Sequence, residues 1–457
     1  MNAAADLARY DFAAPPLVRF GAGRIGELGE LVALHGREAW LVGGVRSFVN
    51  SSARQAIERS LIAAGIPWRL VAESACEPTV DQVAAAVAGL PVEGRETAVV
   101  VAIGGGAAID LAKAVAALAT NAGHLPPGPT SPEAFDALVV DHLEGVGSGR
   151  TISRWPLPLV AVPTTAGTGA EATRNAVISC PRRRFKKSMR SPMMVPRAAI
   201  VDPELTLSCD RGATAASGTD CITQLIEAFI CRFKKPLPRA LVLESLPRAV
   251  GALPRVLRDP ADLEARGALS HAALLSGLAL ANSGLGMAHG VAAALGVECA
   301  TPHGVACGLM LPVALAVNAE AARGDFAILE RSIDPDAPAD DRSAAASFVA
   351  RITDLCAEAG LPRRLSEVGL ERSRLRWLAE HSGGTSMRGN PVELSAAALE
   401  AVLELYYCPS RPGSPAAFSS TGSSSRGRSS EASAPPRSAR CQASRALSRS
   451  GCGFVAW

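Results

Sequence analysis

The 457-residue sequence has little excess charge and no recognisable targeting segment. Its 46 basic and 43 acidic residues leave a formal net charge of +3, so we expect no nucleic-acid partner. The first residues, MNAAADLARYDF, include an acid and no apolar core, so we predict no secretory signal peptide. No internal repeat is evident.

Cysteine pairs at metal-binding or redox spacing are also lacking. The eleven cysteines are an odd number without CxxC spacing, which predicts reduced, mostly buried thiols in a cytoplasmic protein. One uncharged stretch, 272–297, is long enough to span a bilayer, but Asn282, His289 and several glycines interrupt it. We therefore predict buried helices there and no membrane partner.

The first half of the chain alternates apolar runs with alanine-rich segments. We predict strands at 38–44, 67–73, 97–106, 158–165 and 198–205, with helices at 49–64, 80–90 and 108–121. Strands that alternate with helices indicate a parallel sheet covered on both faces. Residues 1–207 are therefore predicted to form one α/β domain.

The pattern then changes to long Ala/Leu-rich helices with 3.6-residue periodicity, broken at Pro, Gly and polar loops. Residues 208–405 are predicted to form an all-helical second domain, with a cleft between the domains near 202–207. Residues 406–457 are rich in Ser, Pro, Gly, Ala and Arg, and Glu431 is their only acid. This composition predicts a disordered tail, either a basic interaction segment or a terminus without function, and we favour the second.

A glycine turn follows the predicted strand at 97–106. Gly104, Gly105 and Gly106 close the strand, and the helix after them carries Asp110 and Lys113. Glycine allows the close backbone approach and positive φ that a pyrophosphate turn requires, and a helix N-terminus adds donors. A plain tight turn between strand and helix is the alternative.

A second polar turn, PTTAGTGAEAT at 163–173, also follows an apolar strand. Its hydroxyls, on Thr164, Thr165 and Thr168, can bind ribose or phosphate oxygens. The alternative is that this segment begins a helix, with Thr168 as the N-cap and Glu171 three residues later completing a capping box. Both interpretations can hold together.

Three polar residues lie in apolar surroundings further along the chain. The sequence has only seven histidines, and His289 and His303 sit in glycine-bearing apolar stretches downstream of Asp220. A buried imidazole or carboxylate needs a partner, and a divalent metal satisfies three at once, although a satisfied core histidine is the alternative for each alone. With an open fourth position and no thiolate, such a site suits Fe²⁺ or Zn²⁺. Together with the phosphate turn, it indicates metal-assisted chemistry on a nucleotide cofactor.

Seven motifs, in this order, resemble the iron-containing (group III) alcohol dehydrogenase family over about residues 10–405. The matching segments are FGAG at 20–23, AIGGGAAIDLAKAVA at 102–116, PTTAGTGAEATRNAVIS at 163–179, DPELT at 202–206, SGTDCITQLIEAF at 217–229, GLGMAHGVAAALG at 284–296 and PHGVACGLMLPVALAVN at 302–318.

The resemblance implies a Rossmann-like parallel-sheet domain followed by an all-helical metal-binding domain, an architecture shared with dehydroquinate synthase. It implies that the glycines at 104–106 hold the pyrophosphate and that Thr164, Thr165 and Thr168 line the nicotinamide side. It places the metal ligands at Asp220, His289 and His303. We expect a small-molecule alcohol or aldehyde substrate and a homo-oligomer, a dimer.

Three positions depart from the family pattern. Gln224 stands where a histidine four residues after Asp220 is usual, and its carbonyl oxygen is a weaker ligand, so a three-ligand site as in the related glycerol dehydrogenases is expected. Ala293 replaces a proton-relay histidine, so the proton is expected to pass through water or a ribose hydroxyl. Gly44 replaces an aspartate that binds the ribose 2′-hydroxyl in NAD-preferring relatives. Its loss admits a 2′-phosphate, contacted by Arg46 or Arg19, so NADP joins NAD as a candidate cofactor.

We therefore predict a metal- and NAD(P)-dependent alcohol dehydrogenase or aldehyde reductase. The metal, Fe or Zn, would polarise the substrate oxygen while hydride moves to or from the nicotinamide ring. One alternative is a dehydroquinate-synthase-like lyase, which the PTTAGTG motif and the lack of a basic cluster disfavour. The other is a nucleotide-binding protein whose metal site has decayed at Gln224.

Overall fold

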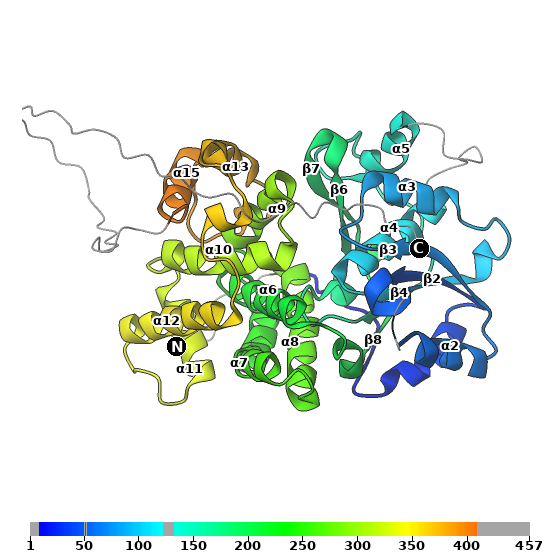
Figure 1. The fold of residues 1–457 in the computed structure, drawn as a ribbon, viewed down its shortest axis with the longest axis horizontal. Coiled ribbons are helices and arrows are strands. Elements are labelled where there is room, and N and C mark those ends of the chain that lie inside the picture. Colours follow the sequence, from blue (N-terminus) through cyan, green and yellow to red (C-terminus); the bar gives the residue numbers. More distant parts are fainter. Residues whose placement is uncertain (1–8, 50, 52, 122–131, 409–457) are drawn as a thin grey trace, which may run out of the picture. The chain divides into compact units, whose positions relative to one another are not determined.

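The computed structural model describes residues 9–49, 51, 53–121 and 132–408, and Figure 1 shows their arrangement. The greater part of the predicted tail, residues 409–457, lies outside the described residues. Residues 406–408 of the predicted tail are described. The backbone carbonyls of Tyr406 and Tyr407 accept hydrogen bonds from Leu365 and Ser366, and both rings pack against the helical core. The folded part therefore extends past Leu405, where the sequence placed the start of the tail.

The N-terminal domain is built on a six-stranded sheet in which every pairing is parallel. In spatial order the strands are β1 (Leu17–Phe20), β8 (Ala198–Val201), β5 (Leu159–Pro163), β4 (Ala98–Gly104), β2 (Glu38–Gly44) and β3 (Trp68–Ser74). The central strands β4, β5 and β8 are buried along their whole length, as expected for a parallel sheet with two covered faces. The five predicted strands are all present, and β1, a short edge strand, was missed.

Alternate residues of β4 enter two separate cores. Val100 and Ala102 pack under α3 (Val80–Ala88), α4 (Gly106–Asn121) and α5 (Pro132–Val139). Val99 and Val101 face α1 (Leu28–Ala33) and α2 (Ala53–Ala63). Because strand side chains alternate, one apolar run supplies both cores, and the predicted two-sided cover is confirmed.

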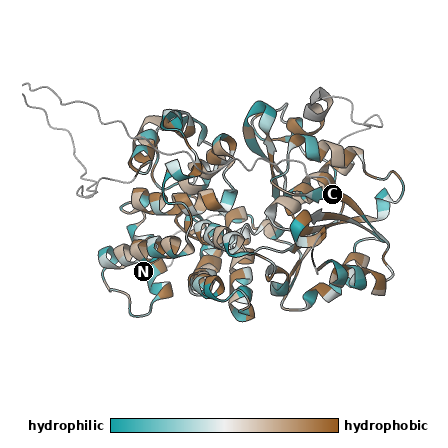
Figure 2. Ribbon diagram, in the orientation of Figure 1, coloured by the Kyte–Doolittle hydropathy of each residue, from teal (hydrophilic) through white to brown (hydrophobic). Residues whose placement is uncertain are grey.

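Between β5 and β8 one local prediction is wrong and one element was missed. The segment after the threonine turn does not begin a helix, because Gly169 takes a left-handed conformation and only a 3-10 turn, Ala170–Ala172, follows. An antiparallel hairpin of β6 (Asn175–Cys180) and β7 (Phe185–Arg190) comes next. Figure 2 shows hydrophilic residues along this hairpin, whereas the sheet strands are coloured as hydrophobic.

The second domain consists of helices. They are α6 (Arg211–Ile230), α7 (Pro236–Arg258), α8 (Leu263–Asn282), α9 (Met287–Cys299), α10 (His303–Asn318), α11 (Arg323–Ile333), α12 (Asp341–Ala359), α13 (Leu375–His381), α14 (Thr385–Arg388) and α15 (Ala396–Leu405). The sequence predicted that prolines would break these helices, and for two prolines this is wrong. Pro247 and Pro254 lie inside α7, which packs along α6 and α8, so tertiary packing outweighs the lost backbone hydrogen bonds.

The uncharged stretch 272–297 falls on α8 and α9, which meet at 97° and are largely buried. Within the described ranges no single helix is long and apolar enough to cross a membrane, and only this bent pair meets the criterion, by length and composition alone. The bend lies at the Ser283–Gly286 segment and lets the start of α9 approach α6. It thereby positions His289.

Candidate metal centre and cofactor cleft

One face of the buried helix α6 carries polar side chains. Asp220, Gln224 and Glu227 are spaced by four and three residues, so they share that face, and each is no more than 3% exposed. The helix is fixed at its start by Asp210, whose carboxylate accepts a hydrogen bond from the Ala213 amide at 2.7 Å. Three polar groups inside an apolar bundle require partners.

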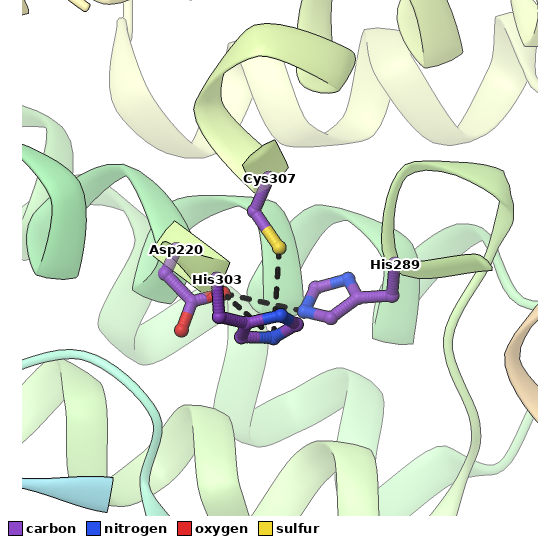
Figure 3. Close-up of side chains that lie close together, drawn as sticks. All are labelled: Asp220, His289, His303 and Cys307. Atoms are coloured by element: carbon purple, nitrogen blue, oxygen red, sulfur yellow. Dashed lines mark hydrogen bonds and ion pairs between the residues drawn. The ribbon is translucent and has the colours of Figure 1, made fainter. Parts of the chain in front are cut away.

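Helices α9 and α10 bring two imidazoles to Asp220 (Figure 3). His289 Nε2 lies 3.3 Å and His303 Nε2 lies 3.9 Å from the Asp220 Oδ1 atom. His289 is in the first turn of α9, and His303 is the first residue of α10. The three residues that the sequence singled out therefore converge on one point.

A thiol completes this cluster. Cys307 Sγ lies 3.7 Å from His303 Nε2, and the ligand atoms of Asp220, His289, His303 and Cys307 all lie within 4.8 Å of one another. The sequence predicted a site without sulfur ligands, so Cys307 is an addition to the predicted set. Its signal was the HGVAC spacing, since residues four apart on a helix share a face.

Two atoms of the cluster suit a cation. Asp220 Oδ1 and His289 Nε2 are buried and have no hydrogen-bond partner among the described residues. These two atoms lie 3.3 Å apart without hydrogen-bond geometry, so a buried carboxylate oxygen and a buried imidazole nitrogen are left poorly satisfied, which is costly. A divalent ion satisfies both, so these residues fit the metal that the sequence predicted.

Glu227 orients His289 and was missed from the sequence. Its Oε2 atom lies 2.7 Å from His289 Nδ1, and its carboxylate also accepts the amides of Gly286 and Ala288 at 2.9 and 2.7 Å. A carboxylate at Nδ1 keeps the proton there and presents the Nε2 lone pair to the cluster. Its position seven residues after Asp220 was the available signal.

The charges of the cluster follow from burial and from its neighbours. Burial opposes ionisation of Asp220, but the imidazoles of His303 and His289 hold its pKa below the usual value. Burial lowers the pKa of His303 to about 4 and raises that of the Cys307 thiol to about 12. Burial also acts against a charged His289, yet Cys307, Asp220 and Glu227 raise its pKa well above the usual value. An incoming cation would replace a proton at His289.

Gln224 contacts the cluster only through Asp220. Its amide nitrogen donates to Asp220 Oδ2 at 3.1 Å, and its amide oxygen accepts from the Ser276 hydroxyl at 2.8 Å. The orientation is fixed by chemistry, because only the NH₂ group can face a carboxylate. Gln224 therefore orients Asp220 through the oxygen opposite the cluster.

A cleft of about 640 Å³ joins this cluster to the N-terminal domain. Its walls include Gly106, Asp110 and Thr168 from one domain and Gln224, His289 and His303 from the other. Ala293, at the position of the predicted missing relay, also lines it.

The two predicted phosphate- and ribose-binding turns pack against each other. A Cβ atom on Gly106 would lie 2.7 Å from the Thr168 side chain, and one on Gly105 would lie 3.3 Å from Thr165. Gly104 has a φ of +152°, and its carbonyl accepts a hydrogen bond from the Thr164 amide. Only glycine fits here, and the turn leads directly into the 16-residue helix α4. A backbone cradle at a helix N-terminus fits a pyrophosphate.

Gly44 ends β2 next to this turn. A Cβ atom there would lie 3.7 Å from Gly104 Cα and 2.4 Å from the Ser47 hydroxyl. Arg46 follows and is exposed. Arg19 is elsewhere: it lies on edge strand β1, with β8, β5 and β4 between it and β2, and pairs with Glu27 at 2.6 Å. The structure therefore does not bring Arg19 to a 2′-phosphate.

Asp110 and Lys113 are placed differently from each other. Asp110 lines the cleft, accepts the Val177 amide at 3.0 Å, and has a pKa raised by burial to about 6. Lys113 is 1% exposed, and its ammonium donates to oxygens of Ala170, Thr173 and Asn175 at 2.6 to 3.1 Å. Burial lowers the pKa of Lys113 to about 8. Its donors are engaged by the segment that carries the second turn.

Comparison with known proteins agrees with this geometry. The family model "Iron-containing alcohol dehydrogenase" matches residues 15–203, and the C-terminal model of the same family matches residues 214–407. An Escherichia coli K12 protein named "Probable alcohol dehydrogenase EutG" is 30% identical over 397 residues, covering 86% of this chain and 93% of that protein. The lactaldehyde reductase of the same strain is 29% identical over 393 residues, covering 85% and 96% respectively.

Solved structures lead to the same family. The crystal structure of a 1,3-propanediol oxidoreductase superposes with a TM-score of 0.78 at 26% identity and covers 88% of this chain and all of that one. Neither the family matches nor these relatives support the lyase or the non-catalytic alternative. The chain therefore belongs to the iron-containing alcohol dehydrogenase family and is a metal-dependent oxidoreductase of the alcohol dehydrogenase and aldehyde reductase class.

Proposed function

We propose that Asp220, His289 and His303 hold a divalent metal beside a bound NAD(P), and that an alcohol or carbonyl substrate reacts between them. Residues 1–207 would bind the nucleotide, and residues 208–405 would hold the metal and the substrate. One observation carries this assignment. Two buried, unpartnered atoms, Asp220 Oδ1 and His289 Nε2, converge beside the cleft whose opposite wall holds the glycine turn.

A divalent ion at this cluster would act as a Lewis acid on the substrate oxygen. Two neighbouring side chains orient the ligands for this ion. Asp220 supplies a negative charge that Gln224 orients, and Glu227 holds the His289 ring with its lone pair inward. Both carboxylates are held by hydrogen bonds to helices of the same bundle, so the ligands would need little rearrangement on binding.

The dinucleotide would lie along the N-terminal wall of the cleft. The backbone at Gly104–Gly106 would cradle the pyrophosphate, and Thr164, Thr165 and Thr168 would line the nicotinamide side. Asp110 would line the cleft beside the bound cofactor. Lys113 would stabilise the 170–175 segment next to the cofactor through its hydrogen bonds. Gly44 leaves the adenosine ribose without a carboxylate, so we assign NADP with Arg46 as the partner of the 2′-phosphate.

Release or uptake of the proton would use solvent. Ala293 lines the cleft where the sequence lacks a relay histidine, so the chain offers no imidazole there. The proton on the substrate oxygen would then pass through water or a ribose hydroxyl.

The names of two of these relatives give small molecules as substrates, lactaldehyde and 1,3-propanediol. For this chain we propose a small aliphatic alcohol or aldehyde, in a homodimer that works in the cytoplasm. The described cysteines are all free, which suits a reducing compartment. Light scattering after size-exclusion chromatography would test the dimer.

The decisive experiment uses protein purified without chelator. Oxidation of NADPH and NADH would be followed against a panel of small aldehydes, before and after removal of metal and after its return. We expect turnover that disappears with the metal and returns with Zn²⁺ or Fe²⁺. Full activity in metal-free protein would refute the assignment.

A further inference from the structure

The cluster has room for a fourth ligand, and Gln224 is not suited to supply it. Its amide oxygen accepts the Ser276 hydroxyl, and its NH₂ group, which has no lone pair to offer, points at Asp220. Reversal of the amide would set its oxygen against the Asp220 carboxylate at 3.1 Å, which is repulsive. A ligand from this position would cost both hydrogen bonds.

Cys307 is placed to supply the fourth ligand that Gln224 does not. It lies one turn after His303 on α10, is fully buried, and has its sulfur in the cluster (Figure 3). In a tetrahedral site with bonds of about 2.0 to 2.3 Å, ligand atoms lie about 3.3 to 3.6 Å apart. The observed separations are 3.3 Å for Asp220 Oδ1–His289 Nε2 and 3.7 Å for His303 Nε2–Cys307 Sγ. Two edges of the polyhedron are therefore nearly formed.

We infer that Cys307 is a fourth protein ligand, which makes an Asp/His/His/Cys site that binds Zn²⁺ in preference to Fe²⁺. This inference rests on the proposed function in one respect: the same cluster must bind a divalent ion, which would take the substrate oxygen as a fifth ligand. On binding, the S–H bond of Cys307 breaks, a sulfur–metal bond forms, and the proton leaves to solvent. No oxidant or reductant is required. Thiolate favours Zn²⁺ over Fe²⁺, whereas oxygen and imidazole ligands alone discriminate less.

Cobalt substitution tests this ligand directly. Co²⁺ replaces Zn²⁺ in such sites, and a thiolate bound to it adds a charge-transfer band in the near ultraviolet to its visible d–d bands. The metal-free protein would be titrated with Co²⁺ and its absorption recorded. We expect both sets of bands in the unaltered protein. Visible bands without the near-ultraviolet band would exclude Cys307 as a ligand and leave the proposed function standing.

Matched variants show which cysteine causes the near-ultraviolet charge-transfer band. Cys307→Ala should lose it, whereas Cys221→Ala should keep it, because Cys221 is equally buried, adjoins Asp220 and lies outside the cluster. Zn²⁺ affinity should fall by about 100-fold or more in Cys307→Ala. It should fall by about tenfold in Gln224→Leu, which loses the hydrogen bonds to Asp220 and Ser276 but no ligand. Equal losses in the two variants would contradict the inference. If Cys307→Ala fails to fold, the spectrum of the unaltered protein still decides.

The remaining outcomes separate this inference from the function. A charge-transfer band in a protein that transfers no hydride with either cofactor would refute the proposed function and support the ligand. No binding of Co²⁺ at all would refute both. Metal content gives a further measure: protein made with equal Zn²⁺ and Fe²⁺ available should contain Zn²⁺, and an iron-filled site would overturn the preference.

Discussion

Two buried polar clusters lie on opposite sides of the cleft, and they differ in how far the protein satisfies them. In the N-terminal domain, Lys113 donates to four oxygens of the 170–175 segment, and Glu171 lies buried nearby. In the helical domain, Asp220 Oδ1 and His289 Nε2 have no hydrogen-bond partner in the part of the chain that the structure describes. The first cluster is closed by the chain itself and supports the fold. The second is left open, as a ligand site must be.

The largest effect should come from removing a side chain of the open cluster. His303→Ala deletes one of its imidazoles, so we expect kcat/KM to fall by about 1,000-fold or more, with loss of bound metal. The unfolding temperature of the metal-free protein should hardly change, because the His303 side chain is 30% exposed at the cleft and belongs to no apolar core cluster. Metal analysis and calorimetry on the same preparation would check this. An active variant with a full complement of metal would remove the open cluster from the mechanism.

The closed cluster should behave in the opposite way. Lys113→Met removes the ammonium donor from the carbonyls of Ala170, Thr173 and Asn175, although the Ala170 oxygen keeps the Thr173 amide and hydroxyl as donors. The free energy of unfolding should therefore fall by about 2 to 4 kcal/mol. Urea denaturation would measure this loss. Zn²⁺ affinity should stay within about twofold, and a large change in it would mean that the two clusters are coupled across the cleft.

Glu171 makes the closed cluster sensitive to pH. Burial raises its pKa from 4.5 to about 7. An acid with a raised folded pKa binds its proton more tightly in the folded state, so its contribution to stability is full below pH 4.5 and declines up to pH 7. The decline amounts to about 3 kcal/mol. Glu171→Gln should flatten that part of the stability profile, measured by denaturation at several pH values. An unchanged profile would show that the pKa of Glu171 is the same in the folded and unfolded states.

We expect a smaller effect from changing Glu227, which orients His289 in the open cluster. Glu227→Gln replaces a carboxylate that accepts the His289 ring proton and two backbone amides with a side chain that cannot accept all three. We expect Zn²⁺ affinity to fall 10- to 100-fold. Competition with a chromogenic chelator would measure it. If affinity is unchanged, the orientation of His289 must come from packing alone.

The sequence predicted the open cluster better than the closed one, for a physical reason. Asp220, His289 and His303 are unusual residues in apolar motifs, and each is visible in its own segment. Glu227 and Cys307 gain their roles only when α9 and α10 pack against α6. The engagement of Lys113 likewise depends on the turn at Gly169, where a helix was expected. Partners that come from distant segments are fixed by packing, which local patterns do not encode.

The smallest effect concerns a position outside both clusters. Gly44→Asp would place a carboxylate beside the glycine turn, where it should repel a 2′-phosphate and favour the ribose hydroxyl of NADH. Ser47 would have to rotate away, which costs little because its hydroxyl is the end of a mobile side chain. We expect the ratio of kcat/KM for NADPH to that for NADH to fall by about tenfold, or about 1.4 kcal/mol. Gly44→Asn is the matched control, because it fills the same space without charge and should leave the ratio nearly unchanged. An equal shift in both variants would mean that the position acts by size. A native preference for NADH would mean that the absent carboxylate does not set cofactor choice, so that selection lies elsewhere along the cleft.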